Sequence, residues 1–199
     1  DFRLDQRFLM ERFICGSLEF TGQAISHQEY TEYRQVKVRP SSYVPNLSVL
    51  SLDIECSPKG VLYSVGLHAK DYQKVIMVGE PQQSHDYIEW VHDEATLLDA
   101  LEVAIQTRDP DIIIGWNVIN FDFRLLIKRA QYHGRKLRLG RGQSFAHWRD
   151  SNTDNNGYVS IGGRVVVDGI DSLKSATYHF ASFSLDFVAN ELLNRGKLV

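Results

Sequence analysis

The sequence has few cysteines and no long apolar run. Only two cysteines, Cys15 and Cys56, occur among 199 residues. Neither belongs to a C-x-x-C pair or to a zinc-binding spacing, so a reducing compartment is expected. No apolar run is long enough to cross a membrane, and no signal peptide is visible. We therefore expect a cytoplasmic protein without a membrane partner.

An overall excess of basic residues is also missing. The formal net charge is −3, so no global positive field points to nucleic acid. Acidic residues are absent, however, from residues 123–149. This basic stretch either holds a phosphate backbone or forms a solvated helix face and loop, and the aromatic residues near it either stack on bases or pack. Its basic residues are Arg124, Lys128, Arg129, Arg135, Lys136, Arg138, Arg141 and Arg149.

The composition is that of a folded chain. Hydrophobic residues make up 43% and aromatic residues 11%, which is enough for a buried core. The length allows one domain of ordinary size and an appendage. The sequence begins at Asp1 without a methionine and ends at Val199 just after a helical pattern. We interpret it as a fragment of a longer chain.

Periodicity and turn residues predict two parts. Residues 1–47 are expected to form a small β-rich lead-in, with a helix or strand at 7–14 and a strand at 18–22. In residues 48–199, short turns predict antiparallel strands at 49–55, 61–68 and 74–78. Asp93 is the predicted N-cap of a helix that ends at Arg108. The apolar run 112–116 predicts a strand covered on both faces with a parallel neighbour.

The remaining pattern completes an α/β class. It predicts a helix at 121–133, a hairpin at 145–161, a strand at 164–167, and helices at 172–178 and 184–193. A mixed sheet, with three antiparallel strands followed by parallel ones and with helices on its faces, accounts for this order.

The strand at 49–55 carries two acids on one face. Side chains alternate along a strand, so Asp53 and Glu55 share a face and lie ~7 Å apart. Two buried like charges need a cation to neutralise them. By itself the stretch favours an exposed strand end with two solvated acids over a divalent-metal site.

A second stretch adds a third acid. Residues 115–123 form a polar loop at the end of a buried strand and open a helix with Asp122 in its first turn. Placed at the same sheet edge as Asp53 and Glu55, Asp122 completes three carboxylates of a two-ion site.

These residues resemble motifs of family B DNA polymerases. Ser51-Leu52-Asp53-Ile54-Glu55 is similar to their first exonuclease motif, Asp-x-Glu. Asn117-Val118-Ile119-Asn120-Phe121-Asp122 matches the second, Asn-x-x-x-Phe-Asp, at every defined position. Residues 7–14 and 163–168 also resemble the family, and residues 115–123 and 183–186 are most similar to its bacterial, polymerase II-like branch. The resemblance covers nearly the whole chain.

The resemblance implies a ribonuclease H-like fold and a proofreading 3′→5′ exonuclease that uses two Mg²⁺ ions on single-stranded DNA. Mn²⁺ should substitute for Mg²⁺ in such an all-oxygen site. Asp53 would bridge both ions, Glu55 would bind the ion that holds the attacking water, and Asp122 would hold the other ion.

The same resemblance implies the DNA contacts and the partners. Asn117 and Phe121 would position the primer terminus. Arg124 and Lys128, from the basic stretch, are predicted as further DNA-binding residues. The implied partners are a single-stranded 3′ end, a primer–template and the rest of a DNA-directed DNA polymerase, with a sliding clamp as a further suggestion. DNA replication or repair would be the setting.

The family pattern fails at its third exonuclease motif, Tyr-x-x-x-Asp, which has no match in residues 123–199. Asp168, Asp171 and Asp186 are interpreted as structural residues. We expect the missing motif, together with the polymerase domains, to lie beyond Val199. The fragment alone is then expected to lack polymerase activity and to have weak or absent exonuclease activity.

Two other hypotheses fit the residues. One is a stand-alone ribonuclease H-like exonuclease. The other is a metal-free DNA-binding module that uses the basic stretch and the hairpin at 145–161.

Overall fold

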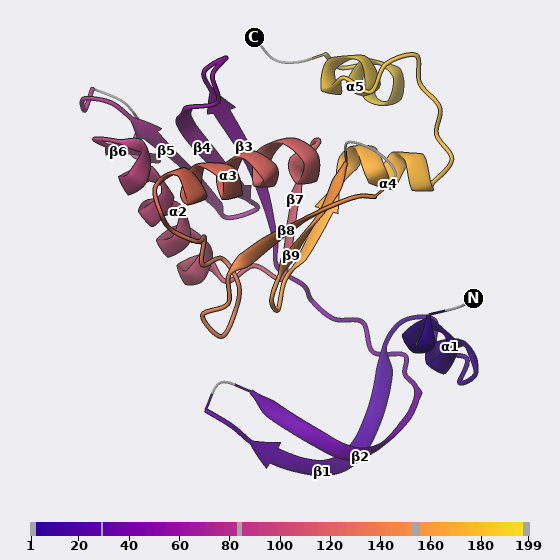
Figure 1. Cartoon of the computed structure of the whole chain (residues 1–199). Helices are drawn as coiled ribbons and strands as arrows, with labels where there is room; N and C mark the ends of the chain where they lie inside the picture. The colour runs from indigo at the N-terminus through magenta and orange to yellow at the C-terminus, as the bar shows by residue number, and fades with distance from the viewer. Residues whose placement is uncertain (1–2, 29, 83–84, 153–155, 197–199) are drawn as a thin grey trace. The chain divides into compact units, whose positions relative to one another are not determined.

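The structure is a computed structural model that describes residues 3–28, 30–82, 85–152 and 156–196 (Figure 1). The chain divides into two units, residues 1–46 and residues 47–199. None of the helices in the described ranges is long and apolar enough to span a membrane.

Residues 3–28 and 30–46, the described part of the first unit, form one helix and one hairpin. Helix α1 (Leu4–Met10) settles the alternative at 7–14 in favour of a helix. Strands β1 (Leu18–Ser26) and β2 (Thr31–Pro40) pair antiparallel, so the strand expected at 18–22 is confirmed and is longer. Almost all side chains of this hairpin are exposed. A two-stranded sheet of this kind is marginally stable by itself.

The second unit is built on a mixed sheet. Its strand order is β10-β7-β3-β4-β5-β6. The three antiparallel neighbours β3, β4 and β5 and the parallel strands β7 and β10 confirm the predicted mixed α/β sheet. The sequence prediction missed β6, which pairs parallel to β5. The strands are β3 (Val49–Cys56), β4 (Leu62–Ala69), β5 (Tyr72–Val78), β6 (Ile88–Val91), β7 (Ile112–Gly115) and β10 (Val165–Asp168).

Helix α2 (Glu94–Arg108) begins and ends as the sequence predicts. The side chain of Asp93 accepts a hydrogen bond from the backbone N of Thr96 at 2.8 Å, which caps the first turn. Asp109 ends the helix in the left-handed conformation, with φ 48°. The next helix starts earlier than expected, as a π-helical turn η1 (Val118–Phe123) that continues into α3 (Arg124–Tyr132).

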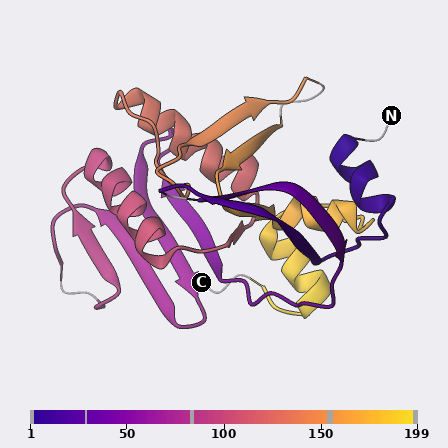
Figure 2. The same cartoon turned by 90° about the horizontal axis from the view of Figure 1, so that it is seen from below.

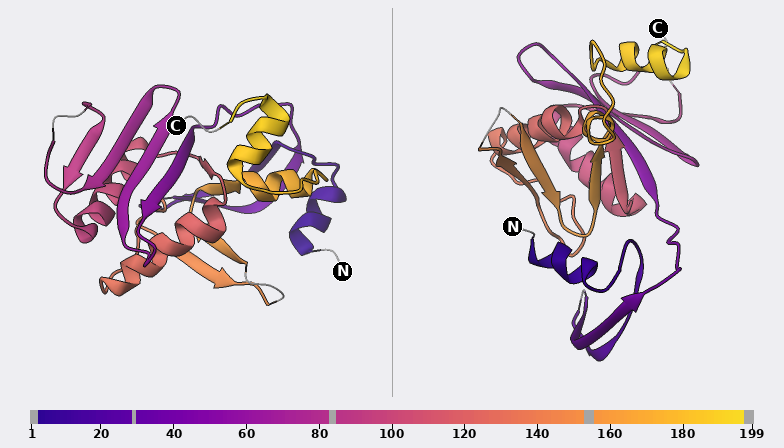
Figure 3. Two further views of the ribbon diagram at one scale, coloured as in Figure 1. Left: turned by 90° about the horizontal axis from the view of Figure 1, so that it is seen from above. Right: turned by 90° about the vertical axis from the view of Figure 1, so that its right-hand side faces the viewer.

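Both α2 and α3 lie on the same side of the sheet (Figure 3). Leu50 and Ile113 are buried on that side, whereas Ile114, the next residue of β7, is 37% exposed. The prediction that β7 is covered on both faces is therefore wrong for the part of the chain that is described. The sequence could not show which face of β7 is exposed, because the three isoleucines of this strand have the same hydropathy.

The predicted hairpin at 145–161 is confirmed. Strands β8 (Ala146–Asp150) and β9 (Gly157–Ile161) pair antiparallel and run beside α3 (Figure 2). Residues 153–155 of the connecting turn lie outside the described residues. The chain continues through β10 to α4 (Gly169–Ser175) and α5 (Leu185–Leu193). Helix α4 starts three residues before the predicted position because Asp168 caps it.

Half of the basic stretch is neutralised by acids of α2 and of the loop that follows it. Four arginines are engaged in this way, so they stabilise the fold and do not form a free basic surface. The pairs are Arg129 with Glu94, Arg135 with Asp99 and Glu102, Arg138 with Glu102, and Arg141 with Asp109 and Asp111.

Glu94 is a buried acid of this network. Its carboxylate accepts hydrogen bonds from Leu62 N at 2.8 Å and from Arg129 Nε at 2.7 Å, and lies 2.6 Å from His133 Nε2. Burial alone would raise the pKa of Glu94, but the hydrogen bonds from Arg129 and Leu62 outweigh it and lower the pKa to about 2. Glu94 thus joins β4, α2 and α3 as a charged group.

Replacing this carboxylate should destabilise the second unit. We expect Glu94→Ala to lower the free energy of unfolding by about 3–5 kcal/mol at pH 7, because it leaves the Arg129 charge buried without a partner. Folding lowers the pKa of Glu94 from 4.5 to about 2, so its contribution is complete above pH 4.5 and is lost as the pH falls toward 2. Urea unfolding followed by circular dichroism at pH 7 and pH 3 measures both effects. Exposed Glu80→Ala is the control, and a Glu94→Ala variant as stable as this control would contradict the argument.

Candidate metal centre

Strand β3 presents its acids on the open face of the sheet. Leu50, Leu52 and Ile54 are buried, whereas Asp53 and Glu55 are exposed, so the predicted alternation is confirmed. The pairing with β4 shifts register between Glu55 and Cys56, where the strand ends. The two acids therefore share one face at the end of a core strand.

Asp122 reaches this strand from η1. It is 1% exposed, and its Oδ1 atom accepts a hydrogen bond from the backbone N of Ile54 at 3.0 Å. Ile54 lies between Asp53 and Glu55 in the chain. The bond therefore fixes the third predicted carboxyl against the same segment of β3.

The surroundings of Asp122 disfavour its charged form. Burial raises the pKa of Asp122, the negative charge of Asp53 raises it further, and the hydrogen bond from Ile54 only partly opposes them, so the pKa is about 7. No ion pair to Asp122 occurs among the described residues. A buried carboxyl beside a second acid is the arrangement that a bound divalent cation stabilises. These two residues therefore fit a metal-binding role.

Glu55 is exposed on the same face of β3 as Asp53. Within the described ranges, no group of three or more His, Cys, Asp or Glu side chains is arranged to hold a metal ion. Asp53 and Asp122 interact electrostatically, since the negative charge of Asp53 raises the pKa of Asp122. The role of Glu55 as a third ligand stays a prediction.

The loop before Asp122 depends on two special backbone positions. A Cβ atom on Gly115 would lie 2.6 Å from the carbonyl oxygen of Leu52, so only glycine allows β7 to approach β3 this closely. Asn117 has φ 57°, a left-handed conformation that asparagine tolerates better than most residues. Asn117 therefore has a structural role in this motif, in addition to the contact with DNA that the sequence predicts.

Asp168 holds this loop in place. Its carboxylate accepts hydrogen bonds from Asn117 N at 3.2 Å and from Ile119 N at 3.0 Å, and it caps α4 through Ile170 N. The interpretation of Asp168 as a strand-end and capping residue is confirmed. The sequence did not show that this residue also positions the loop that carries Asp122, because β10 and η1 are distant in the chain.

A cleft of about 620 Å³ lies between the β3–β4 turn and the start of α3. Three of the four residues predicted to bind DNA line it, and Asn117 is not in the lining. Phe121 is 45% exposed there, which leaves its ring accessible. Sequence reasoning missed the turn side of the cleft, since no local pattern places that turn beside α3. The lining residues are Cys56, Ser57, Pro58, Gly60, Asn120, Phe121, Arg124, Leu125 and Lys128.

The profile of the DNA polymerase family B exonuclease domain matches residues 23–188. The chain belongs to this family. It is 39% identical over 204 residues to DNA polymerase II of Escherichia coli (strain K12), an alignment that covers 100% of the chain and 26% of that protein. It is 30% identical over 183 residues to the DNA polymerase delta catalytic subunit of Plasmodium falciparum, which covers 77% of the chain and 17% of that protein.

The fold of this family B chain is found in a solved relative. The structure of the family B DNA polymerase from the hyperthermophilic archaeon Pyrobaculum calidifontis superposes with a TM-score of 0.70 and 21% sequence identity. The match covers 96% of the family B chain described here and 25% of the archaeal one. The chain therefore spans about a quarter of the length of the E. coli relative and of the solved polymerase.

The raised pKa of Asp122 predicts a pH-dependent cost in stability. Folding raises this pKa from 3.8 to about 7. Ionisation of Asp122 therefore does not lower the free energy of unfolding below pH 3.8, and it lowers that free energy progressively as the pH rises from 3.8 to about 7. We expect Asp122→Asn to be more stable than the parent by about 2–4 kcal/mol at pH 8 without metal. The two proteins should converge near pH 4.

Chemical unfolding in EDTA across pH 4–8 measures this difference. Asp86→Asn, at an exposed acid outside the centre, is the matched control. A parent protein as stable as Asp122→Asn at pH 8 would contradict the argument.

Proposed function

We propose that this chain provides most of a proofreading 3′→5′ exonuclease domain, which hydrolyses the 3′-terminal nucleotides of single-stranded DNA with two Mg²⁺ ions. The main support for the proposal is the buried Asp122 carboxyl, which is held against β3 beside Asp53. The match of the chain to the family B exonuclease domain agrees with it. Mn²⁺ is expected to replace Mg²⁺.

The chain's own acids would hold the ions and orient the water. Asp53, Glu55 and Asp122 would hold the ions, and Glu55, on the same face of β3 as Asp53, would bind the ion that holds the attacking water. When bound, the ions supply Lewis acidity that activates water and stabilises negative charge on the leaving oxygen. The hydrogen bond from Ile54 keeps Asp122 in place while its charge changes.

The cleft beside η1 would receive the terminal nucleotide. The exposed Phe121 ring offers a face on which a base can stack, and Arg124 and Lys128 offer positive charge to the phosphates. Asn117, at the start of η1, would contact the sugar or base of the terminus.

The wider assignments are also proposals. Residues 1–47 would be a lead-in lobe, and residues 48–199 would be the exonuclease domain up to its third motif, within a longer DNA-directed DNA polymerase that binds a primer–template. The support is the similarity to relatives named as DNA polymerases. A cytoplasmic location, a sliding clamp as partner, and a role in replication or repair stay predictions of the family resemblance.

Metal binding tests the centre directly. We expect the 199-residue chain to bind Mn²⁺, and Asp53→Asn and Asp122→Asn each to weaken that binding about tenfold or more. Isothermal titration calorimetry at pH 7.5 gives the affinities, and Asp86→Asn should bind like the parent. Unchanged binding in both variants would remove these residues from the centre.

Cleavage tests the activity. In the complete polymerase, Asp53→Ala should slow Mg²⁺-dependent shortening of a 5′-labelled single strand about 100-fold or more. The 199-residue chain should be weak or inactive in the same assay. Turnover by the chain equal to that of the complete polymerase would show that no further carboxylate is needed.

Phe121 should act in substrate binding. Phe121→Ala removes a base-stacking surface worth about 1–3 kcal/mol, so we expect KM for single-stranded DNA to rise by about fivefold to 100-fold in the complete polymerase while Mn²⁺ binding stays unchanged. Steady-state cleavage measures KM. Tyr132→Ala, at an exposed aromatic residue of α3 outside the cleft, is the control, and an equal effect of both variants would argue against stacking at Phe121.

A further inference from the structure

A second pocket, of about 420 Å³, lies between α3 and β8. Its floor is formed by the buried side chains of Ile127, Leu137 and Ala146. Ala146 N donates a hydrogen bond to the carbonyl oxygen of Leu137 at 2.8 Å, which fixes β8 to the segment after α3. The pocket is therefore built from packed elements, and its volume is in the range of small-ligand sites.

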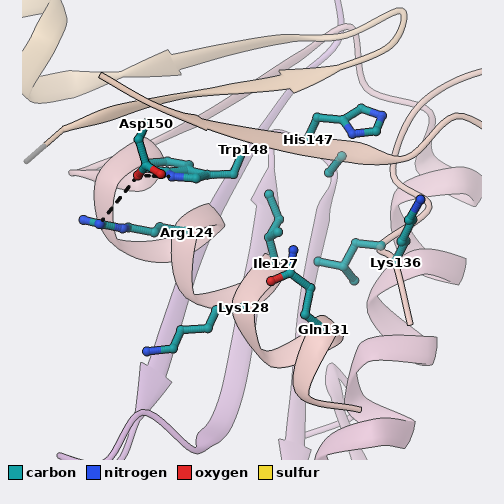
Figure 4. A pocket seen from close by; sticks show the side chains of 10 residues that line it. Arg124, Ile127, Lys128, Gln131, Lys136, His147, Trp148 and Asp150 are labelled. Atoms are coloured by element: carbon teal, nitrogen blue, oxygen red, sulfur yellow. Dashed lines mark hydrogen bonds and ion pairs between the residues drawn. The ribbon is translucent and has the colours of Figure 1, made fainter. Parts of the chain in front are cut away.

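The rim of this pocket is mainly basic. Figure 4 shows Lys136 at one end, and Arg124 with Lys128 at the other. In the described part of the chain, Lys128 and Lys136 take part in no ion pair, in contrast to the four arginines that pair with α2 and its following loop. Asp150 is the acid of the lining, and it lies 3.9 Å from Arg124. The net charge of the rim favours an anionic ligand.

Trp148 provides a fixed aromatic surface in the same pocket. Its Nε1 atom donates a hydrogen bond to Asp150 Oδ1 at 2.9 Å, and the Arg124 guanidinium lies 5.3 Å from the ring centroid. A Cβ atom on Gly157 would lie 2.1 Å from the indole, so the glycine backbone packs directly on the ring. An aromatic ring held in this way beside cations is the combination that binds single-stranded nucleic acid.

From these observations we infer that this pocket is a second nucleotide subsite. A base stacks on Trp148, and phosphates lie at Lys136 and at Arg124–Lys128. The inference rests on the proposed function for the identity of the ligand as DNA. Arg124 and Lys128 line both this pocket and the cleft that holds Phe121, so one strand passing over this row of α3 can occupy both. A free nucleoside monophosphate has the same chemistry and can enter the same subsite.

Titration without metal tests the subsite apart from cleavage. The indole N–H resonance of Trp148 in ¹H–¹⁵N spectra of the 199-residue chain in EDTA is assigned by comparison with Trp148→Phe. Oligo(dT) of six nucleotides, dTMP, inorganic phosphate and a poly-glutamate peptide are added in turn. We expect saturable shifts with oligo(dT) and with dTMP. Tighter binding of the oligonucleotide identifies a strand as the ligand, and equal binding identifies the mononucleotide. No shift with either, or an equal shift with poly-glutamate, overturns the inference.

Lys136 provides the specific variant because it lines this pocket and not the Phe121 cleft. Lys136→Ala should weaken the oligonucleotide binding seen at Trp148 and lower the slope of log K against log salt by about 0.7, the value for one phosphate contact on a single strand. Lys70→Ala, in the β4–β5 turn, is the matched control and should leave both unchanged. Identical binding by the parent and Lys136→Ala overturns the assignment.

The two proposals fail in different measurements. If Mn²⁺ binding and cleavage are absent while the Trp148 resonance responds to oligo(dT), the proposed exonuclease centre is wrong and the subsite stands. If Mn²⁺ binds at Asp53 and Asp122 while the Trp148 resonance does not respond, the centre stands and the subsite is wrong.

Discussion

The hydrogen bond from Ile54 N to the carboxyl of Asp122 joins the two halves of the candidate centre. It ties the turn that leaves β7 to the strand that carries Asp53, and it does so at a position where the carboxyl is almost fully buried. Two features keep this contact in place. Strand β7 approaches β3 closely at Gly115, and Asp168 accepts hydrogen bonds from the backbone of Asn117 and Ile119. The fold thereby holds two acids together against their electrostatic repulsion, which is a cost that a bound cation would relieve.

Charge elsewhere in the second unit is arranged for stability. Glu94 of α2, buried against β4, pairs with Arg129 of α3, and Glu102 of α2 pairs with Arg135, which follows α3. These pairs fix the helices to one another and to the sheet. They also engage four of the arginines of the basic stretch, so these four do not form a free basic surface.

Arg124 and Lys128 lie where two pockets meet, whereas Lys136 lines the pocket that holds Trp148. The cleft with Phe121 borders the turn after β3, and the pocket with Trp148 lies beneath β8 (Figure 4). Arg124 and Lys128 are one helical turn apart, so they form a short row that both pockets share. The hairpin therefore has a local role: it brings an aromatic ring of β8 to the basic side of α3.

Much of this protein follows from the sequence alone. Alternation placed Asp53 and Glu55 on one face, capping and turn residues predicted the bounds of α2, and two motifs indicated the family. These features depend on contacts between near neighbours in the chain. The exposed side of β7, the short parallel strand β6 and the start of α3 in a π-helical turn could not be predicted, because each depends on what packs against it.

Only the tertiary structure decided which charges are paired and which pockets form. The basic residues of this stretch look alike in sequence, yet four arginines meet acids thirty or more residues away, whereas Lys128 and Lys136 form no ion pair with any residue that the structure describes. Asp122 and Glu55 likewise appear equal in their motifs. Asp122 is buried against the backbone of β3, whereas Glu55 is exposed on that strand. Electrostatic energy depends on the distance between charges and on their burial, and the local sequence determines neither of these.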